Sequence, residues 1–319
     1  MFVQEDGDSD SSQELMSAKT RTKKEIDEDL KRLREWLSKQ PHLPKNIDDE
    51  ILTAYVNGTK SLEIAKQKLD AYYSSKSKVP HLFSFPARDM DDDGFKQGCE
   101  ALKVFFLPKK TPENYIVLFV TFDLDFSKFD HDQYLVRLMM MVDLAMLRWP
   151  DAEGIVLATD LSGMDASIFT KCNVTTSGFF FNWFQKTIAM KLKKAVAVNA
   201  PKFFETVMNS FVRPFLSQKL YGRIIVTSEG VSALKKFIPE QLLPVDLGGN
   251  EKSSTDLNKY WLEELHKRKE WFVKTNQQLV DETRRPADKL STYGVDGTFR
   301  SLTVPRRIAR NGRESKVRN

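Results

Sequence analysis

The fold class is decided by residues 191–230, KLKKAVAVNAPKFFETVMNSFVRPFLSQKLYGRIIVTSEG. The stretch opens with a basic cluster and a short apolar run, and it turns at Asn199-Ala200-Pro201. A half-apolar helix follows, and a second apolar run begins near Arg223. Strand, helix and strand in this order are typical of an α/β layer with parallel strands. What the helix covers is then the question that bears on function.

The helix predicted at 201–212 is amphipathic. At about 100° per residue, its apolar side chains cover roughly half of the circumference. Pro201 suits the first turn and Pro214 ends the helix. Such a helix lies on an apolar surface, which is core, ligand or membrane. Its apolar face consists of Phe203, Phe204, Val207, Met208, Phe211 and Val212.

Basic residues flank this helix on both sides. Lys191 and Lys193 alternate with Leu192, so they are predicted to share one face of an extended segment. Lys219 and Arg223 are four residues apart and are predicted to share a helical face. These cations form either a solvated surface or a docking surface for an anionic membrane, where each is worth about 1 kcal/mol.

The alternation of strands and helices extends toward the N-terminus. Strands are predicted at 102–107, 115–122, 154–160, 195–199 and 223–227. Helices are predicted between most of them, at 131–149, 177–190, 201–212 and 231–237. The first two strands are close enough for an antiparallel hairpin. The predicted class is therefore α/β, with a mixed, mainly parallel sheet.

Residues 21–86 are predicted to form a small all-helical domain. Its helices span 23–40, a second segment capped by Asn46 and broken at Asn57-Gly58, and a third that begins at Ser61. Residues 95–255 form the α/β domain. Residues 1–20, with five acids among the first sixteen, are predicted to be disordered. Residues 256–319 are predicted to be helical and then a disordered basic tail, with ten basic and three acidic residues from Arg284 onward.

The sequence lacks the motifs that are typical of membrane-spanning, secreted, nucleotide-binding and metal-binding proteins. No apolar run approaches the roughly 18–20 residues of a membrane span, and residues 1–16 do not resemble a signal peptide. Cys99 and Cys172 make no disulfide framework, which favours a cytoplasmic protein. There is no P-loop, GxGxxG or GxSxG motif, and the four histidines have no metal-ligand spacing. We therefore predict no catalytic residue, no metal and no cofactor.

Two acidic features require a choice between structure and chemistry. Asp123 and Asp125 form a DxD in a turn context, which favours turn hydrogen bonds over cation binding. Asp160 ends a predicted strand, where α/β enzymes often place a carboxylate. No second catalytic group stands near it at a suggestive spacing, so we predict that Asp160 hydrogen-bonds its loop.

The chain is rich in apolar and aromatic side chains rather than in catalytic groups. Phe179, Phe180, Phe181, Trp183 and Phe184 crowd one predicted helix. Met139, Met140 and Met141 stand in a row on another, and flexible methionine suits an irregular ligand as well as a core.

At these residues the sequence resembles the CRAL-TRIO lipid-binding family. The matching features are GIVLATDLSGMD, AVNAP, RPFLSQKL, RIIVTS and LPVDLGG in this order, preceded by the helical SLEIAKQKLDAYY. It looks most similar to the branch of the α-tocopherol transfer protein and the retinaldehyde-binding protein, and to an insect member of it. The resemblance implies an apolar pocket between the sheet and a mobile lid helix, without catalysis.

The resemblance also implies three sets of site residues. The lid is the helix at 201–212, with Phe203, Phe204, Val207, Met208 and Phe211 facing pocket or membrane. A phosphoinositide site falls on Lys191, Lys193, Lys219 and Arg223. The pocket wall is drawn from Leu135, Leu138, Val142, Ile155, Leu157, Phe180, Trp183, Phe184, Ile188, Leu192, Val207 and Phe211.

The chain also departs from the family's pattern. An arginine-rich helix of the family, one arginine of which joins the basic cleft, reads LTAYVNG here, with Ala54, Val56 and Gly58. The headgroup site is then weaker or rebuilt. The lid is one residue longer between its two prolines than is usual, and the basic tail has no counterpart.

The function that follows is a carrier for one hydrophobic small molecule, similar to a tocopherol, retinoid or carotenoid. The carrier is predicted to be a cytoplasmic monomer that docks reversibly on phosphoinositide-containing membranes and opens its lid there. The alternative is a phospholipid-binding sensor or adaptor that recruits a partner. A nucleic-acid-binding protein that uses the tail and an α/β enzyme that uses Asp160 are weaker alternatives, and no nucleic-acid partner is predicted.

Overall fold

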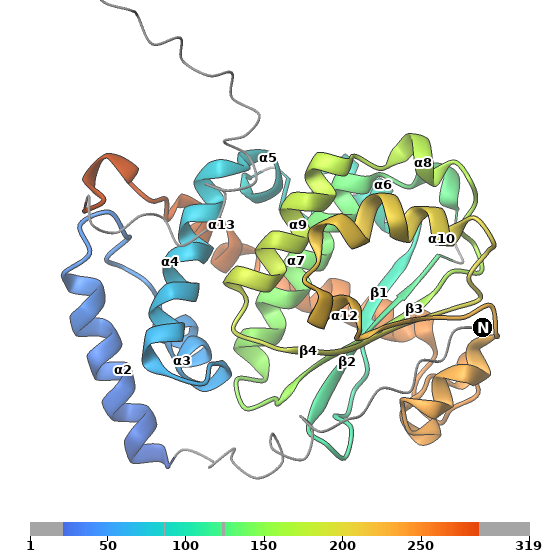
Figure 1. Ribbon diagram of the computed structural model, residues 1–319, viewed down its shortest axis with the longest axis horizontal. Helices are drawn as coiled ribbons and strands as arrows, with labels where there is room; N and C mark the ends of the chain where they lie inside the picture. Colours follow the sequence, from blue (N-terminus) through green and yellow to red (C-terminus); the bar gives the residue numbers. More distant parts are fainter. Residues whose placement is uncertain (1–21, 86, 123–124, 287–319) are drawn as a thin grey trace, which may run out of the picture.

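The computed structural model describes residues 22–85, 87–122 and 125–286 (Figure 1). The predictions for residues 1–20, for Asp123 and for the tail beyond residue 286 lie outside the described residues.

A five-stranded sheet forms the centre of the molecule, in the order β1-β2-β3-β4-β5. β1 pairs antiparallel with β2, as the predicted hairpin requires, and the other strands are parallel. The predicted class is therefore confirmed. The strands are β1 (Lys103–Phe106), β2 (Tyr115–Thr121), β3 (Gly154–Asp160), β4 (Leu192–Val198) and β5 (Ile224–Val226).

Two long helices and a series of short ones pack around this sheet. α7 and α9 cross one face of it, and both begin at a side-chain cap, Asp130 and Asn173 respectively. The α-helices of this part are α6 (Asp93–Cys99), α7 (His131–Arg148), α8 (Ile168–Lys171), α9 (Val174–Thr187), α10 (Phe204–Val207) and α11 (Gln218–Tyr221). The other helical turns are Phe126–Lys128, Met208–Val212, Arg213–Phe215, Val231–Lys236, Glu240–Leu242 and Val245–Leu247.

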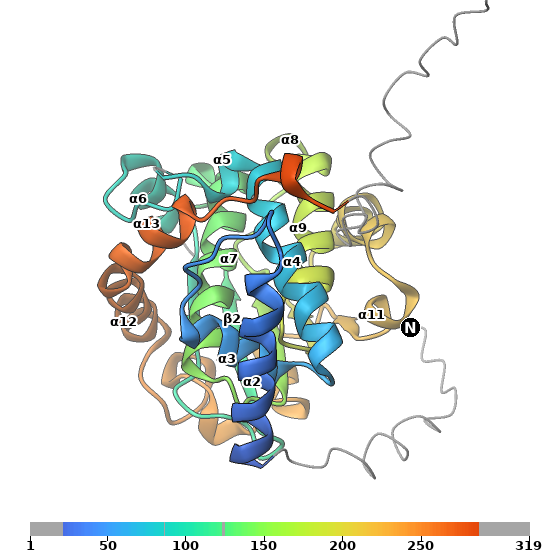
Figure 2. The same ribbon diagram turned by 90° about the vertical axis from the view of Figure 1, so that its left-hand side faces the viewer.

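The N-terminal helices are α2 (Lys23–Ser38), α3 (Asp49–Gly58), α4 (Leu62–Lys78) and α5 (Pro80–Phe83). α3 and α4 pack on α7 and α9 (Figure 2). A Cβ on Gly58 would lie 1.9 Å from the carbonyl oxygen of Ala189, so only glycine permits this approach. The Tyr55 hydroxyl donates to the Thr187 carbonyl at 2.9 Å. Ala54 and Val56 are buried in this packing.

The C-terminal segment returns to the N-terminal helices. It consists of α12 (Ser254–Lys267), α13 (Lys269–Gln277) and a helical turn at Glu282–Arg284. α12 covers the edge strand β1, where the Asn258 side chain accepts from the backbone of Val104 at 3.0 Å. Beyond α13, the Arg285 guanidinium binds both Asp70 carboxylate oxygens at 2.9 Å. These contacts connect the C-terminal segment to the N-terminal helices and to the sheet.

Some predicted boundaries were wrong. The N-cap position of the second helix is Asp48 rather than Asn46, without a side-chain capping hydrogen bond, and the segment at 231–237 is a 3₁₀ helix. The helix predicted at 201–212 is α10 followed by a single π-helical turn, Met208–Val212. Pro214 ends the helix soon after this turn, because it has no N–H to continue the α-helical hydrogen bonds.

Candidate functional site

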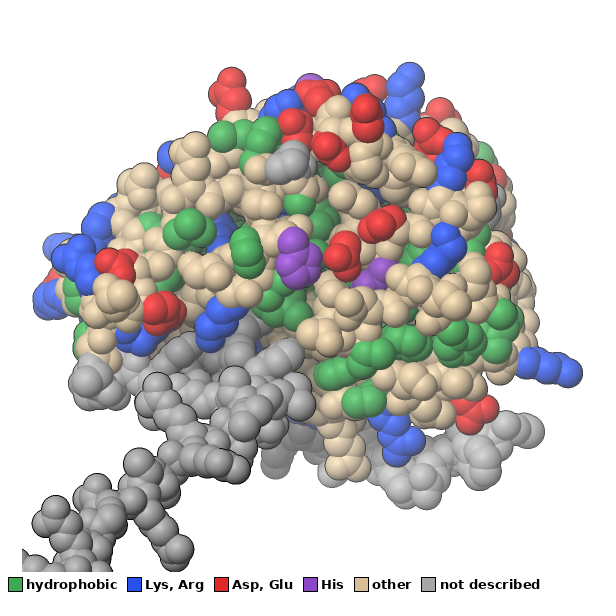
Figure 3. Space-filling model, turned by 90° about the horizontal axis from the view of Figure 1, so that it is seen from above, with side chains coloured by type: hydrophobic (Ala, Val, Ile, Leu, Met, Phe, Trp, Pro, Cys, Tyr) green, Lys and Arg blue, Asp and Glu red, His purple; other side chains and the backbone are tan. Residues whose placement is uncertain are grey.

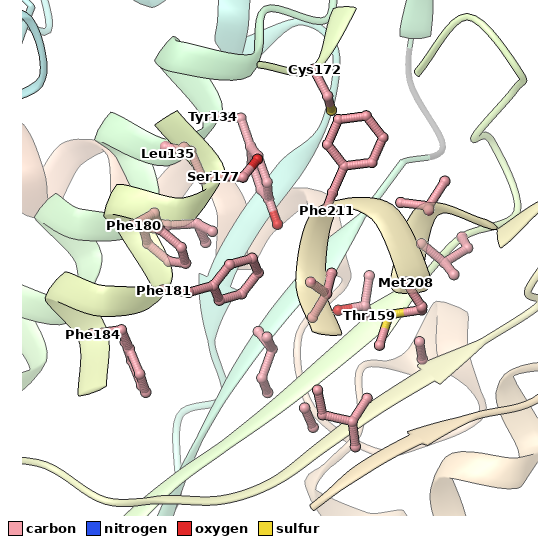
Figure 4. Close-up of a pocket in the computed structure, with 18 of the residues that line it drawn as sticks. Tyr134, Leu135, Thr159, Cys172, Ser177, Phe180, Phe181, Phe184, Met208 and Phe211 are labelled. Atoms are coloured by element: carbon pink, nitrogen blue, oxygen red, sulfur yellow. The ribbon is translucent and has the colours of Figure 1, made fainter. Parts of the chain in front are cut away.

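A cavity of about 220 Å³ lies between the sheet, α7, α9 and the α10 segment. Its wall is almost entirely apolar, and side chains from all four elements point into it (Figure 4). The apolar faces of the sheet, α7, α9 and the α10 segment are turned toward one another, and their side chains do not fill the space between them.

Most of the predicted wall residues meet at this cavity. Ten of them line it: Leu135, Leu138, Val142, Ile155, Leu157, Phe180, Phe184, Leu192, Val207 and Phe211. Trp183 and Ile188 do not line it, and both are fully buried elsewhere. The Trp183 ring packs against Phe83 of α5 at 6.4 Å, on the side of α9 that faces the N-terminal helices. Ile188 follows the last turn of α9, and its carbonyl accepts from Lys68 of α4 at 2.8 Å.

The methionine row of α7 does not belong to the cavity. Met139, Met140 and Met141 are completely buried core residues. The methionines that line the cavity are Met164 and Met208, the latter on the segment that covers it. A row of consecutive residues spreads around a helix, so adjacency in sequence does not place side chains on one face.

The segment 201–214, hereafter the lid, covers the cavity with its apolar face. Phe204, Val207, Met208 and Phe211 point inward and are at least 92% buried, while Glu205 and Ser210 are exposed. Phe203 turns outward and contacts Phe169 of α8 at 6.0 Å between ring centroids. The half-apolar pattern read from the sequence therefore covers a cavity rather than a filled core.

The lid is attached at its two ends. Before it, Asn199 adopts a left-handed φ of 54°, and its side-chain amide donates to the Asp160 carboxylate at 2.8 Å. After it, the Gln185 side chain of α9 donates to the carbonyl of Phe215 at 2.9 Å. Between these anchors, within the part of the chain that the structure describes, residues 201–213 make hydrogen bonds only inside segment 201–216. Apolar packing and an Arg213–Tyr221 cation–π contact at 5.5 Å hold the lid down.

The cavity also has polar groups that the sequence did not reveal. His131 and Tyr134 of α7, Ser177 of α9 and Thr159 of β3 all line it. The Ser177 hydroxyl lies 3.1 Å from Nε2 of the buried His131. The sequence could have placed His131 and Tyr134 at the cavity. They lie on the same helix face as the predicted wall residues Leu135, Leu138 and Val142, at spacings of three and four.

The four predicted headgroup cations do not converge as one cluster. Lys193 crosses over Gly154 and places its ammonium 4.9 Å above the Tyr115 ring of β2. Arg223 lies outside α11, so it shares no helical face with Lys219, and it donates to the carbonyl of Leu192. Lys191 and Lys219 are exposed. A bulge in β4 between the residues paired with Ile155 and Val156 accounts for the altered direction of Lys193.

Lys191, Lys219 and Arg223 are adjacent in sequence to the cavity wall. Each of them precedes a residue that lines the cavity, namely Leu192, Leu220 and Ile224. These residues lie at the start of β4, on α11 and at the start of β5 respectively.

The acidic residues serve the structure, as expected. The Asp160 carboxylate accepts from the Ser162 backbone at 3.0 Å and from Asn199. Asp125 accepts from the Ser127 backbone at 3.1 Å in a turn. No group of three or more metal-ligating side chains occurs in the described ranges 22–85, 87–122 and 125–286.

Sequence comparison agrees with this architecture. The profile of the CRAL/TRIO domain matches residues 100–249, which include the sheet, the cavity wall and the lid. Residues 100–249 therefore form a CRAL-TRIO domain. Residues 22–95, which contain the N-terminal helices, match a Pinta-like UBA domain.

Individual CRAL-TRIO relatives are distant. The chain is 22% identical over 240 residues to an alpha-tocopherol transfer protein-like protein of Mus musculus, and 21% identical over 225 residues to the one of Homo sapiens. Each match covers 69% of this chain and 64% of the relative, so less than two thirds of these relatives is spanned. The crystal structure of Sfh5 aligns with a TM-score of 0.42 and 14% identity, covering 78% of this chain and 98% of that one.

Among the described residues, no helix combines the length and the apolar character that a membrane-spanning segment needs.

Proposed function

We propose that this protein carries one hydrophobic small molecule in the cavity under the lid. The observation that supports this most directly is the apolar cavity of about 220 Å³, whose cover is the inner face of the lid. Apolar area removed from water contributes about 25 cal/mol per Å², so a prenyl chain or ring system enclosed here would bind tightly. The same burial makes spontaneous release into water slow.

Release therefore requires the lid to move, and the attachments of the lid suit this. Because its hydrogen bonds are internal, the lid opens without leaving buried polar groups unpaired. Its opening exposes Phe204, Val207, Met208 and Phe211, whose apolar face suits the membrane interface. The proposed transfer is thus lid opening at a membrane, followed by passage of the ligand into the lipid.

The surface beside the lid favours docking at an interface. Phe169 remains 36% exposed next to the half-buried Phe203, and Val174 at the start of α9 is 46% exposed. An apolar band is visible in this region of the molecule when it is seen from above (Figure 3). Lys191, Lys219 and Arg223, which are adjacent in sequence to the cavity wall, would hold phosphoinositide headgroups, with Lys193 as a more distant contributor. Reversible attachment to a cytoplasmic membrane follows from such weak contacts.

The first experiment identifies the ligand. The full-length protein is purified from a eukaryotic host, extracted with organic solvent, and the extract is analysed by mass spectrometry. We expect a stoichiometric prenyl lipid, retinoid or carotenoid. A stoichiometric phospholipid would favour the sensor or adaptor instead, and an empty extract after incubation with mixed lipids would contradict a binding role.

The second experiment tests docking. Ligand transfer to vesicles with and without phosphatidylinositol phosphates is compared between the wild type and a quadruple variant, Lys191→Ala, Lys193→Ala, Lys219→Ala and Arg223→Ala. A control variant with the same charge change replaces Lys23, Lys24, Lys31 and Arg32, which are exposed on the distant helix α2. We expect slower transfer to anionic vesicles only in the first variant. Equal transfer by all three proteins would contradict the docking mechanism.

A further inference from the structure

One end of the cavity departs from its apolar character. His131 and Tyr134 are three residues apart on α7 and therefore lie on the same side of that helix. Ser177 reaches His131 from α9, and the Tyr134 side chain lies near Ser177 in the cavity (Figure 4). The wall toward the other end of α7 continues with Leu135, Leu138 and Val142. The cavity is thus amphipathic along its length.

The Tyr134 hydroxyl is the donor of this polar end. Its oxygen points into the cavity beside Ser177 and Phe211 (Figure 4). Among the residues that the structure describes, this hydroxyl has no hydrogen-bond partner, although the ring contacts Phe122 and Phe129. Burial raises the pKa of Tyr134, so it keeps its proton at neutral pH. A donor that faces an apolar cavity without a protein partner is suited to a ligand or water that accepts from it.

The Ser177 hydroxyl is the acceptor. Nδ1 of His131 lies 3.5 Å from Oδ1 of Asp132 without a hydrogen bond between them, and a carboxylate on that side of the ring favours the tautomer with the proton on Nδ1. Nε2 then accepts the Ser177 proton across 3.1 Å. The lone pairs of Ser177 are left to accept from a group in the cavity.

Serine, histidine and aspartate in this order invite comparison with a hydrolase, but the site lacks an oxyanion hole. The backbone N–H of Ser177 donates to the Asn173 carbonyl at 2.9 Å. The N–H groups of Thr175 and Thr176 donate to the Asn173 side chain at 2.8 and 3.2 Å. Among the residues that the structure describes, the nearest amides are therefore occupied by the helix and its cap, and none of these three is left to stabilise a tetrahedral intermediate. The polar end is suited to binding.

We propose that this end recognises a terminal hydroxyl group, so that the preferred ligand is a lipid alcohol. A hydroxyl both accepts and donates, and it satisfies Tyr134 and Ser177 at once, whereas an aldehyde or ether satisfies only Tyr134 and a hydrocarbon satisfies neither. This inference rests on the proposed function and adds the chemical class and the orientation of the ligand, with its hydroxyl between α7 and α9 and its apolar part along the wall toward Val142.

The test compares three prenyl probes of equal chain length, farnesol, farnesal and farnesene, by calorimetric titration into the full-length wild type. We expect farnesol to bind most tightly and farnesene most weakly. Tyr134→Phe, which removes no internal hydrogen bond, is expected to weaken farnesol binding about tenfold and to leave farnesene unchanged. Ser177→Ala is expected to weaken farnesol and to spare farnesal. Tyr260→Phe, on the exposed face of α12, is the control for the loss of a tyrosine hydroxyl away from the cavity, although it also removes a surface hydrogen bond from Arg148.

The outcomes separate this inference from the function on which it rests. Equal affinity for farnesol and farnesene, or an equal loss of both in Tyr134→Phe, would overturn hydroxyl recognition while leaving the carrier function intact. If none of the three probes binds the wild type and lipid extraction also yields nothing, the carrier function itself fails. Hydrolysis of farnesyl acetate that is lost in Ser177→Ala would show that the polar end is catalytic and would overturn a binding role.

Discussion

The amide of Asn199 donates to the carboxylate of Asp160 at 2.8 Å, and this bond fixes the point where the chain leaves β4 for the lid. Asn199 has a φ of 54°, a conformation that asparagine tolerates and that β-branched residues avoid. Its backbone N–H is also bonded, to the Glu229 carbonyl at 2.8 Å. Both the side chain and the backbone of one residue therefore define the first anchor of the lid.

Replacing Asn199 by valine should destabilise this anchor. The variant loses the bond to Asp160 and places a β-branched residue at positive φ, which together should lower the free energy of unfolding by about 2–4 kcal/mol. Asn199→Gly keeps the backbone conformation and should cost about half as much. Urea denaturation measures both. Equal stability of Asn199→Val and the wild type would show that the anchor is dispensable.

The second anchor is tested at Gly178. A Cβ at this position of α9 would lie 2.6 Å from the Phe215 ring, directly after the lid. Gly178→Ala should push Phe215 outward and loosen lid closure, so we expect a several-fold faster release of a bound prenyl probe in stopped-flow measurements. Gly222→Ala is the control, because its nearest neighbour would be 3.5 Å away. Identical release rates in both variants would argue against Phe215 as an anchor.

The contact of Arg285 with Asp70 should hold the C-terminal segment on the N-terminal helices. Both side chains are about nine-tenths buried, and Asp70 also lies 3.2 Å from His42. Arg285→Ala leaves the Asp70 carboxylate buried without its main partner and should cost about 3 kcal/mol of stability. Arg284→Ala, at the exposed neighbouring position, should cost almost nothing. Limited proteolysis should cut the chain near residue 280 sooner in Arg285→Ala alone, and equal protection of both variants would contradict the contact.

Lys76 should make stability depend on pH. Its side chain is 1% exposed, its ammonium donates to the Thr275 carbonyl at 2.9 Å, and burial lowers its pKa from 10.5 to about 7. Between these two values the unfolded chain binds more protons than the folded one, so the free energy of unfolding rises with pH in that window. The contribution is at most about 1.4 kcal/mol per pH unit.

Lys76→Met tests this linkage. The variant should be less sensitive to pH than the wild type when urea unfolding is measured at pH 7, 8 and 9. Lys68, whose pKa burial lowers to about 8, is present in both proteins and cancels in the comparison. Parallel pH profiles of the two proteins would show that Lys76 titrates normally in the folded state.

The strands and long helices could be predicted from sequence because their patterns are local. β3 has the predicted bounds, and Ser61 caps α4 as expected. The apolar face of the lid was also visible, since a helix repeats its face every three to four residues. The role of Asp160 followed from the absence of any second catalytic group near it.

The predictions that failed concern which way a side chain points when this depends on packing between two elements of secondary structure. Trp183 lies on the same helix as Phe180 and Phe184 but turns toward α5, because α9 packs between the cavity and the N-terminal helices. Lys193 is turned toward β2 by a bulge that no sequence pattern announces. Arg223 falls outside a helix that ends two residues earlier.

The sequence by itself determined the α/β class, the order of the elements and the amphipathic lid, because hydrophobic periodicity is written in neighbouring residues. Only the tertiary structure decided that the lid covers a cavity, that Ser177 meets His131 across 46 positions, and that the Tyr134 hydroxyl points inward without a partner. These relations depend on how far two packed elements approach each other and on which side chains fill the space between them. That is a property of the assembled core and of no single segment.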